Sequence, residues 1–111
     1  STRRPPVMAE RLVLLLALLP AAAWGAEPPP ARQAELVHLL RQDCGSCHGL
    51  TLKGGLGPSL LPVSLAAHEP EGLAQIILKG VPGTPMPPWN FEISPDEALW
   101  LAARLKDGDL P

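Results

Sequence analysis

Five consecutive residues, Cys44-Gly45-Ser46-Cys47-His48, place two thiols and an imidazole at a spacing that suits attachment of a metal macrocycle. A Cys-x-x-Cys-His run is typical of covalent haem attachment. Thiols three positions apart can add across the two vinyl groups on one edge of a haem, and the next residue then lies under the iron. The spacing therefore predicts one covalent haem c, held by Cys44 and Cys47 and ligated by His48.

Three other interpretations of the same residues compete with haem attachment. A thioredoxin-type redox pair also uses two cysteines at this spacing, but it needs a strand–helix–strand context that the sequence does not suggest. A disulfide between Cys44 and Cys47 would leave the adjacent His48 without a purpose. A zinc site needs two further ligands, and His38 and His68 are the only other histidines. We therefore favour haem attachment over these three interpretations.

A second iron ligand is predicted at Met86, the only methionine besides Met8. Its neighbours Pro85, Pro87 and Pro88 stiffen the chain on both sides, so the thioether can be held in place at a low cost in conformational entropy. Methionine paired with histidine is a known axial ligand set in cytochromes. The alternatives are that Met86 only fills space in the core, that His68 ligates instead, or that the sixth position stays open.

Two further groups are expected around the haem. A ligating histidine normally donates its other N–H to a carbonyl or carboxylate. The Gly57-Pro58 turn offers the Pro58 carbonyl for this purpose, unless the turn is a simple break in the loop. Trp89 is expected to lie on the haem edge or to donate to a propionate, with ordinary core packing as the alternative. We therefore count Pro58 and Trp89 among the cofactor-binding residues.

The first 25 residues have the parts of a secretory signal peptide. Arg3, Arg4 and Arg11 precede an apolar run at 12–19, and small residues follow at 21–26. The run is far shorter than the ~20 residues that a membrane span needs. We predict a signal peptide at 1–25, a Pro-rich tether at 26–30 and one domain at 31–111. The alternative is an uncleaved anchor. Cleavage predicts export to the periplasm, with no stable membrane insertion afterwards.

Composition and charge exclude several classes of protein. The chain has 111 residues, enough for one domain, with 15 prolines, four aromatic residues and no alternating apolar pattern of a strand's length. The formal net charge of −2 gives no basic footprint for nucleic acid. From Ala26 onwards six basic residues face ten acidic ones, a net charge of −4. A domain this small buries little surface, and a covalently bound apolar cofactor would stabilise it.

Helical periodicity predicts an all-α fold with three main helices and long loops around one haem. Helices are expected at 31–43, at 71–79 and from an N-cap at Ser94 towards Gly108, where Pro95 and Glu97 complete a start signal. The segments 49–70 and 81–89 are expected to be irregular and to cover the haem. The predicted apolar shell consists of Leu52, Leu56, Leu60, Leu61, Ile76, Ile77 and Leu99.

Several motifs together resemble the class I monohaem cytochromes c of bacteria. They are Cys44-Gly45-Ser46-Cys47-His48, Gly57-Pro58-Ser59-Leu60, the segment Gly80-Val81-Pro82-Gly83-Thr84-Pro85-Met86-Pro87 and the Ser94-Pro95-Asp96-Glu97 helix start. More narrowly, the chain is similar to the small cytochrome c-55X type found with nitrite reductase genes in denitrifying proteobacteria.

This resemblance implies His48 and Met86 as axial ligands, thioethers at both cysteines and periplasmic electron transfer. It also implies that the first and last helices cross. In the family a glycine and an aromatic residue often precede the first cysteine by eight and four positions. Leu36 and Leu40 stand there in this chain, so a wider crossing is expected.

The predicted function is to carry single electrons. With both axial positions filled no substrate can bind the iron, so we expect no enzymatic activity. The expected partners are an upstream electron donor and a denitrification reductase, with cytochrome cd1 nitrite reductase implied by the resemblance. Two alternatives stay open: an accessory role in maturation of the reductase's haem, and gas binding at an open sixth position.

Overall fold

The computed structural model describes Arg3 and residues 27–110. The predicted signal peptide lies, except for Arg3, outside the described residues. The described chain is built from helices and loops, and no strand occurs in it. The prediction of an all-α fold is therefore confirmed. No helix in this described part is long and apolar enough to cross a membrane.

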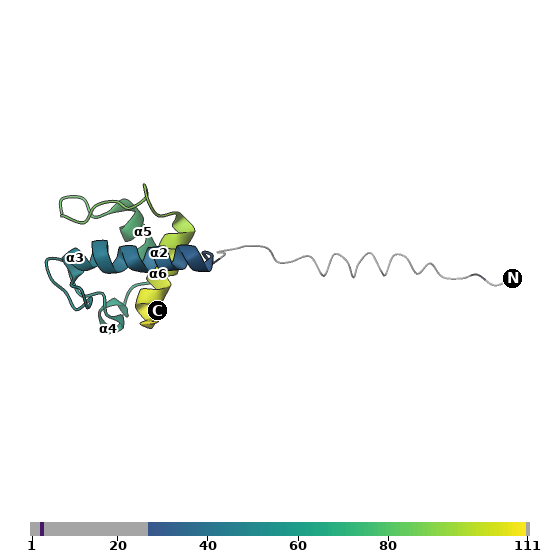
Figure 1. Cartoon of the computed structure of the whole chain (residues 1–111), viewed down its shortest axis with the longest axis horizontal. Coiled ribbons are helices and arrows are strands. Elements are labelled where there is room, and N and C mark those ends of the chain that lie inside the picture. The colour runs from purple at the N-terminus through teal and green to yellow at the C-terminus, as the bar shows by residue number, and fades with distance from the viewer. Residues whose placement is uncertain (1–2, 4–26, 111) are drawn as a thin grey trace.

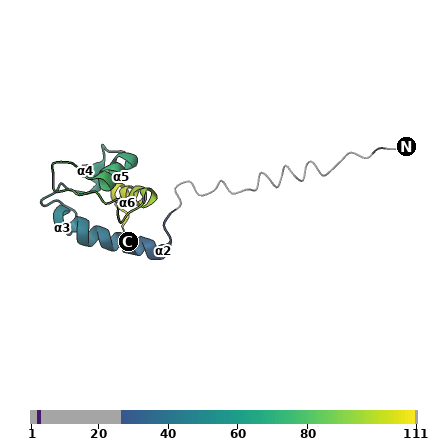
Figure 2. The same ribbon diagram turned by 90° about the horizontal axis from the view of Figure 1, so that it is seen from above.

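Residues 30–48 form one rod composed of three consecutive elements, α2 (Pro30–Leu39), η1 (Leu40–Cys44) and α3 (Gly45–His48). Figures 1 and 2 show α2 and α3 along the same axis. Pro30 suits the first position of α2 because a backbone N–H there would have no acceptor within the helix. Proline, which has no N–H, therefore loses no hydrogen bond at this position. The predicted helix at 31–43 is thus found, but it extends further. It runs through the cysteine motif and stops only at Gly49, whose φ of +92° breaks the helix.

The turn η1 is a π-helix, in which the Gly45 amide donates to the carbonyl of Leu40 five residues earlier. Such wider turns inside α-helices are rare overall, but those that do occur are often found at functional sites. Here the π turn ends on Cys44, so the motif begins where the helix register changes.

A loop at 49–61 leads to α4 (Pro62–Leu65), which is followed by α5 (Pro70–Lys79). The prediction of an irregular chain throughout 49–70 was wrong at α4. This single turn forms because Pro62 starts it and Leu65 is buried against the core. In α5 the buried side chains are those of Leu73, Ala74 and Leu78, whereas Ile76 stays 38% exposed.

The last helix, α6 (Pro95–Asp107), begins at the predicted capping box. The Glu97 amide donates to Oγ of Ser94 over 3.2 Å, and the Ser94 amide donates to Oε1 of Glu97 over 3.0 Å. The helix ends at Gly108 in the left-handed conformation, a common helix stop. Both predicted ends of this helix are confirmed.

The core lies where α6 packs against α2, α4 and α5. Figure 1 shows α6 crossing the rod of α2. Leu36, Leu40 and Leu101 are the largest fully buried side chains, and Trp100 is only 8% exposed. The first and last helices therefore do cross, and both Leu36 and Leu40 are buried.

Candidate functional site

Cys44 and Cys47 lie at the end of the rod, three positions apart along the helix. Both thiols are free and half-buried. Residues three apart in a helix share a face, so both thiols can reach one edge of a macrocycle. Burial raises the pKa of the Cys44 thiol to about 11, with Asp43 and Cys47 adding to the effect. Before haem attachment, Cys44 is therefore an uncharged thiol at neutral pH.

The imidazole of His48 is oriented by the loop that follows it. Its Nδ1 donates to the carbonyl of Pro58 over 2.7 Å, the contact expected of the Gly57-Pro58 turn. With the proton on Nδ1, the Nε2 lone pair is free to bind a metal. The loop is tied to the end of the helix, since the Gly57 amide donates to the Cys47 carbonyl and the Gly54 amide donates to the His48 carbonyl, both over 2.8 Å.

Gly57 lies directly against the ring of His48. A Cβ placed on Gly57 would be 2.8 Å from Cε1, 2.9 Å from Nδ1 and 3.2 Å from Nε2. Real Cβ atoms essentially never approach heavy atoms that closely, so only glycine allows the imidazole to occupy this position. The sequence analysis named Gly57 only as the residue before Pro58. It did not predict the contact between Gly57 and the ring of His48.

Met86 is half-buried on the Pro-rich loop between α5 and α6. Gly80, which ends α5 with a φ of +67°, brings this loop close to the helix. A Cβ on Gly80 would be 2.8 Å from the Met86 carbonyl oxygen and 2.7 Å from atoms of Pro87 and Pro88. The sequence analysis named Gly80 only within the segment that carries Met86, and it did not predict this close approach between Gly80 and the loop.

Trp89 anchors the far end of the Met86 loop. Its amide donates to the carbonyl of Ile77 on α5 over 3.0 Å. Its ring packs against the core and stacks on Phe91 with the ring centroids 5.8 Å apart. The loop therefore returns to α5 at both ends, at Gly80 and at Trp89.

The two loops lie at the same end of the molecule. Figure 1 shows the loop after α3 and the loop after α5 extending past α3, one on each side of it, and Figure 2 agrees in placing both at that end. The chain thus gathers the thiols, the His48 imidazole and the Met86 loop at one end of the rod.

Some of the apolar side chains predicted to surround the haem pack against the core. Several residues are half-buried and pack against the core, namely Leu39, Leu52, Leu60, Ile77 and Leu99. Of the predicted shell, Leu61 is also half-buried, but Leu56 is 78% exposed and Ile76 is 38% exposed. The buried face of α5 consists of residues 73, 74 and 78, so Ile76 lies on a different face of this helix. The apolar shell around the haem stays a prediction.

The competing interpretations of the cysteine motif find no support among the described residues. There is no strand to give a thioredoxin context, no disulfide, and no group of three or more metal-ligating side chains for zinc. His38 and His68 are both exposed, and the His68 carbonyl accepts a hydrogen bond from Nζ of Lys106.

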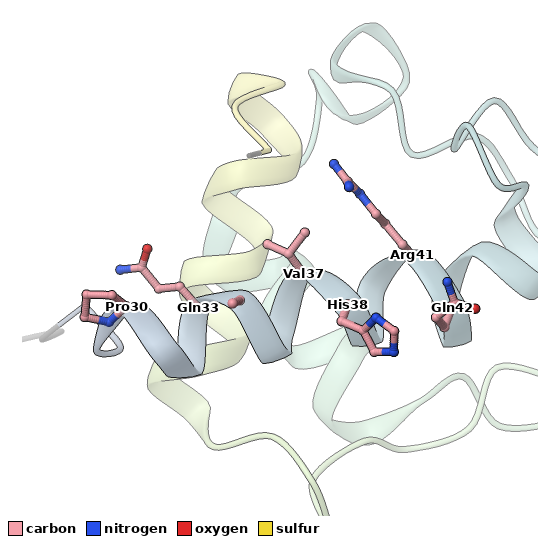
Figure 3. A pocket seen from close by; sticks show the side chains of 7 residues that line it. Pro30, Gln33, Val37, His38, Arg41 and Gln42 are labelled. Atoms are coloured by element: carbon pink, nitrogen blue, oxygen red, sulfur yellow. The ribbon is translucent and has the colours of Figure 1, made fainter.

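A surface pocket lies elsewhere, along α2 and η1 (Figure 3). Seven residues between Pro30 and Gln42 line it, among them Val37, His38 and Arg41. All of them come from the helix that precedes Cys44, and none is a predicted site residue. The pocket is therefore not part of the site at the end of the rod.

The donors at the end of the rod fit a covalently bound haem: two free thiols three residues apart, an imidazole with a free Nε2 and a nearby thioether loop. This arrangement defines a c-type cytochrome. Residues 31–103 match the family described as "Cytochrome C oxidase, cbb3-type, subunit III". The chain belongs to this family of cytochrome c domains, and its cofactor is one covalent haem c.

Among known relatives, cytochrome c55X of Paracoccus denitrificans is 51% identical over 92 residues, which are 83% of this chain and 89% of the relative. A solved structure of the c-type cytochrome NirC superposes with a TM-score of 0.73 and is 54% identical, covering 75% of this chain and 98% of that one. Dihydro-heme d1 dehydrogenase of Pseudomonas aeruginosa is 42% identical over 88 residues, which are 79% of this chain but 17% of the larger relative.

Proposed function

We propose that this chain carries single electrons in the periplasm and delivers them to cytochrome cd1 nitrite reductase. The observation that carries this proposal is the 2.7 Å hydrogen bond from Nδ1 of His48 to the Pro58 carbonyl, beside two free thiols. That bond directs the remaining lone pair of the imidazole away from the protein backbone, as a fixed axial ligand requires.

Each site residue has a distinct role in this proposal. Cys44 and Cys47 would hold the haem through two thioethers, and Nε2 of His48 and Sδ of Met86 would ligate its iron. Pro58 orients the imidazole, and Trp89 lines the haem edge. When bound, the haem supplies reversible one-electron exchange between ferric and ferrous iron. With both His48 and Met86 on the iron, a substrate would have no place to bind there, which favours a carrier over an enzyme.

The partner and the location rest on the relatives and on charge. Relatives named cytochrome c55X and NirC are linked to denitrification, and the predicted signal peptide agrees with a periplasmic protein. Six basic and ten acidic residues at 27–110 give the described domain a net charge of −4. Such a domain is steered towards a basic patch on its partner, and added salt slows the encounter. An upstream donor must re-reduce the protein after each delivery.

The role of Met86 is tested with the holoprotein carrying Met86→Leu, a change that keeps the side chain's volume but removes its sulfur. Ferric wild-type protein should show the weak far-red absorption band of iron–sulfur ligation, and the variant should lack it. The variant's reduction potential should also fall, because methionine ligation raises it. A wild-type spectrum without the band, unchanged in the variant, contradicts the axial assignment.

The partner is tested by rapid mixing of ferrous holoprotein with oxidised cytochrome cd1 nitrite reductase. We expect the observed rate to rise with enzyme concentration and to fall as ionic strength rises. Ferric holoprotein is the control, since it has no electron to deliver. Absence of electron transfer at every ionic strength contradicts the assignment of this reductase as the partner.

A second candidate function is support of haem maturation for the reductase. It is favoured by the match between 79% of this chain and a small part of a relative named dihydro-heme d1 dehydrogenase. In this role the chain would serve as the redox module of a maturation step. A host that lacks the chain should then make nitrite reductase that is deficient in the haem whose maturation the chain supports. The purified chain should also bind the apo-reductase. A fully loaded reductase in that host excludes this second candidate.

A further inference from the structure

The segment 81–86, which carries Met86, is a closed loop with few backbone donors. The Thr84 amide donates to the Val81 carbonyl over 3.2 Å, and the Val81 amide donates to the Met86 carbonyl over 3.1 Å. Pro82 and Gly83, with a φ of +79° at the glycine, occupy the two central positions of the first turn, as a type II turn prefers. These bonds bring the two ends of the segment together.

Prolines limit what else can hold this loop. Four of the eight residues at 81–88 are prolines, which have no amide N–H. The remaining donors therefore carry more of the loop's closure than they would in an ordinary loop. One of them, the Met86 amide, donates to a side chain, Oγ1 of Thr84, over 3.3 Å.

The Thr84 hydroxyl makes two bonds at once. It donates to the Val81 carbonyl over 2.7 Å and accepts from the Met86 amide. It therefore connects the start of the loop to the residue that carries the thioether. Serine can make both bonds, whereas valine has nearly the same shape and can make neither. Thr84 is exposed, so either replacement fits without disturbing the core.

We propose that Thr84 is a positioning residue for the axial thioether: its hydroxyl ties the Met86 backbone to Val81 and so keeps the sulfur on the iron. The inference rests on the proposed ligation of iron by Met86. Thr84 itself does not touch the iron. Loss of its two bonds leaves the Met86 backbone held to Val81 only through the Val81 amide, so the sulfur would leave the iron more often and an added ligand could replace it more easily.

The test is a titration of ferric holoprotein with imidazole, followed through the main (Soret) haem absorption band, which does not depend on the presence of Met86. For Thr84→Val we expect the apparent affinity for imidazole to rise about fivefold, the change that loss of one hydrogen bond of ordinary net strength produces. Thr84→Ser should restore an affinity close to that of wild type. Thr51→Val, at an exposed threonine in the loop after α3, is the matched control and should leave the affinity unchanged.

A double variant separates this inference from the ligation on which it rests. In the Met86→Leu background, Thr84→Val should leave the imidazole affinity unchanged, because no sulfur remains to be positioned. If wild type shows the far-red band but Thr84→Val binds imidazole within about twofold of wild type, well below the change expected for one lost hydrogen bond, the Thr84 inference is overturned and Met86 ligation stands. If Thr84→Val lowers the stability to guanidinium without raising imidazole affinity, the role is structural only and the inference is also overturned.

Discussion

Arg32 on α2 and Glu97 on α6, 65 positions apart in the sequence, form a two-pronged ion pair. Nε of Arg32 donates to Oε2 of Glu97 over 2.7 Å, and Nη2 donates to Oε1 over 3.1 Å. Nη2 also donates to the carbonyl of Glu92 over 2.8 Å. Since Glu97 also caps α6 through Ser94, one carboxylate stabilises a helix start and joins it to the first helix.

This pair predicts a stability that depends on pH. The hydrogen bonds from Arg32, ahead of smaller effects, lower the pKa of Glu97 from 4.5 to about 2. A carboxyl whose pKa is lower in the folded state stabilises the protein above its unfolded pKa, and this contribution is lost as the pH falls from 4.5 towards 2. Because the Glu97 side chain is 19% exposed, we expect a contribution of only about 2 kcal/mol at neutral pH.

The measurement is the free energy of unfolding of ferric holoprotein in guanidinium, for wild type and Glu97→Gln, between neutral pH and pH ~2.5. The difference between the two proteins should be largest at neutral pH and should shrink steadily below the ordinary pKa of glutamate. The haem propionates titrate in both proteins, so their effect cancels in this comparison. A difference that is constant over the whole range contradicts the prediction.

Gly57→Ala should impair the seating of His48. The added methyl group would lie 2.8 to 3.2 Å from three ring atoms, so the imidazole or the loop must shift. We expect a lower yield of protein with both thioethers and an altered ferric spectrum, measured on exported holoprotein. Gly72→Ala on α5 is the control, because its methyl group meets nothing within 4 Å. That control should retain the spectrum and gain up to about 1 kcal/mol of stability.

Gly80→Ala should displace the Met86 loop. Its methyl group would lie 2.7 to 2.8 Å from backbone atoms of residues 86–88, and backbone cannot move aside as a flexible side chain can. The far-red band should weaken or vanish. Gly83→Ala is the matched control, since Gly83 has a similar positive φ but nothing within 4 Å of a new methyl group. Equal loss of the band in both variants would mean that backbone strain causes the effect, and not the contact between residue 80 and the backbone of residues 86–88.

Leu36→Ala tests the crossing of the first and last helices. Leu36 is fully buried, so its truncation removes apolar contact and leaves a cavity. We expect a loss of about 2–5 kcal/mol in the free energy of unfolding. Val63→Ala is the control, because Val63 is 82% exposed and should change stability by less than about 0.5 kcal/mol. A loss at Leu36 no larger than at Val63 would mean that the crossing contributes little to stability.

Much of the site could be predicted because its chemistry is local in the chain. Cys44, Cys47 and His48 are separated by three and one positions, and the capping box at Ser94 and Glu97 spans three. The Pro58 carbonyl could be named because a proline that follows a glycine marks a turn and leaves its carbonyl free. The helix at α5 was also found, but the period alone did not say that residues 73, 74 and 78 form its buried face, because that depends on which neighbour the helix packs against.

What the sequence by itself determined is therefore the class of cofactor, the order of the helices and the identity of the donor groups, because these depend on spacing within a few residues. The tertiary structure decided which glycines are contact points, how far the first helix continues through the cysteine motif, and that Arg32 meets Glu97. Each of these depends on how loops and helices distant in sequence approach one another, and that approach is set by the packing of the whole core.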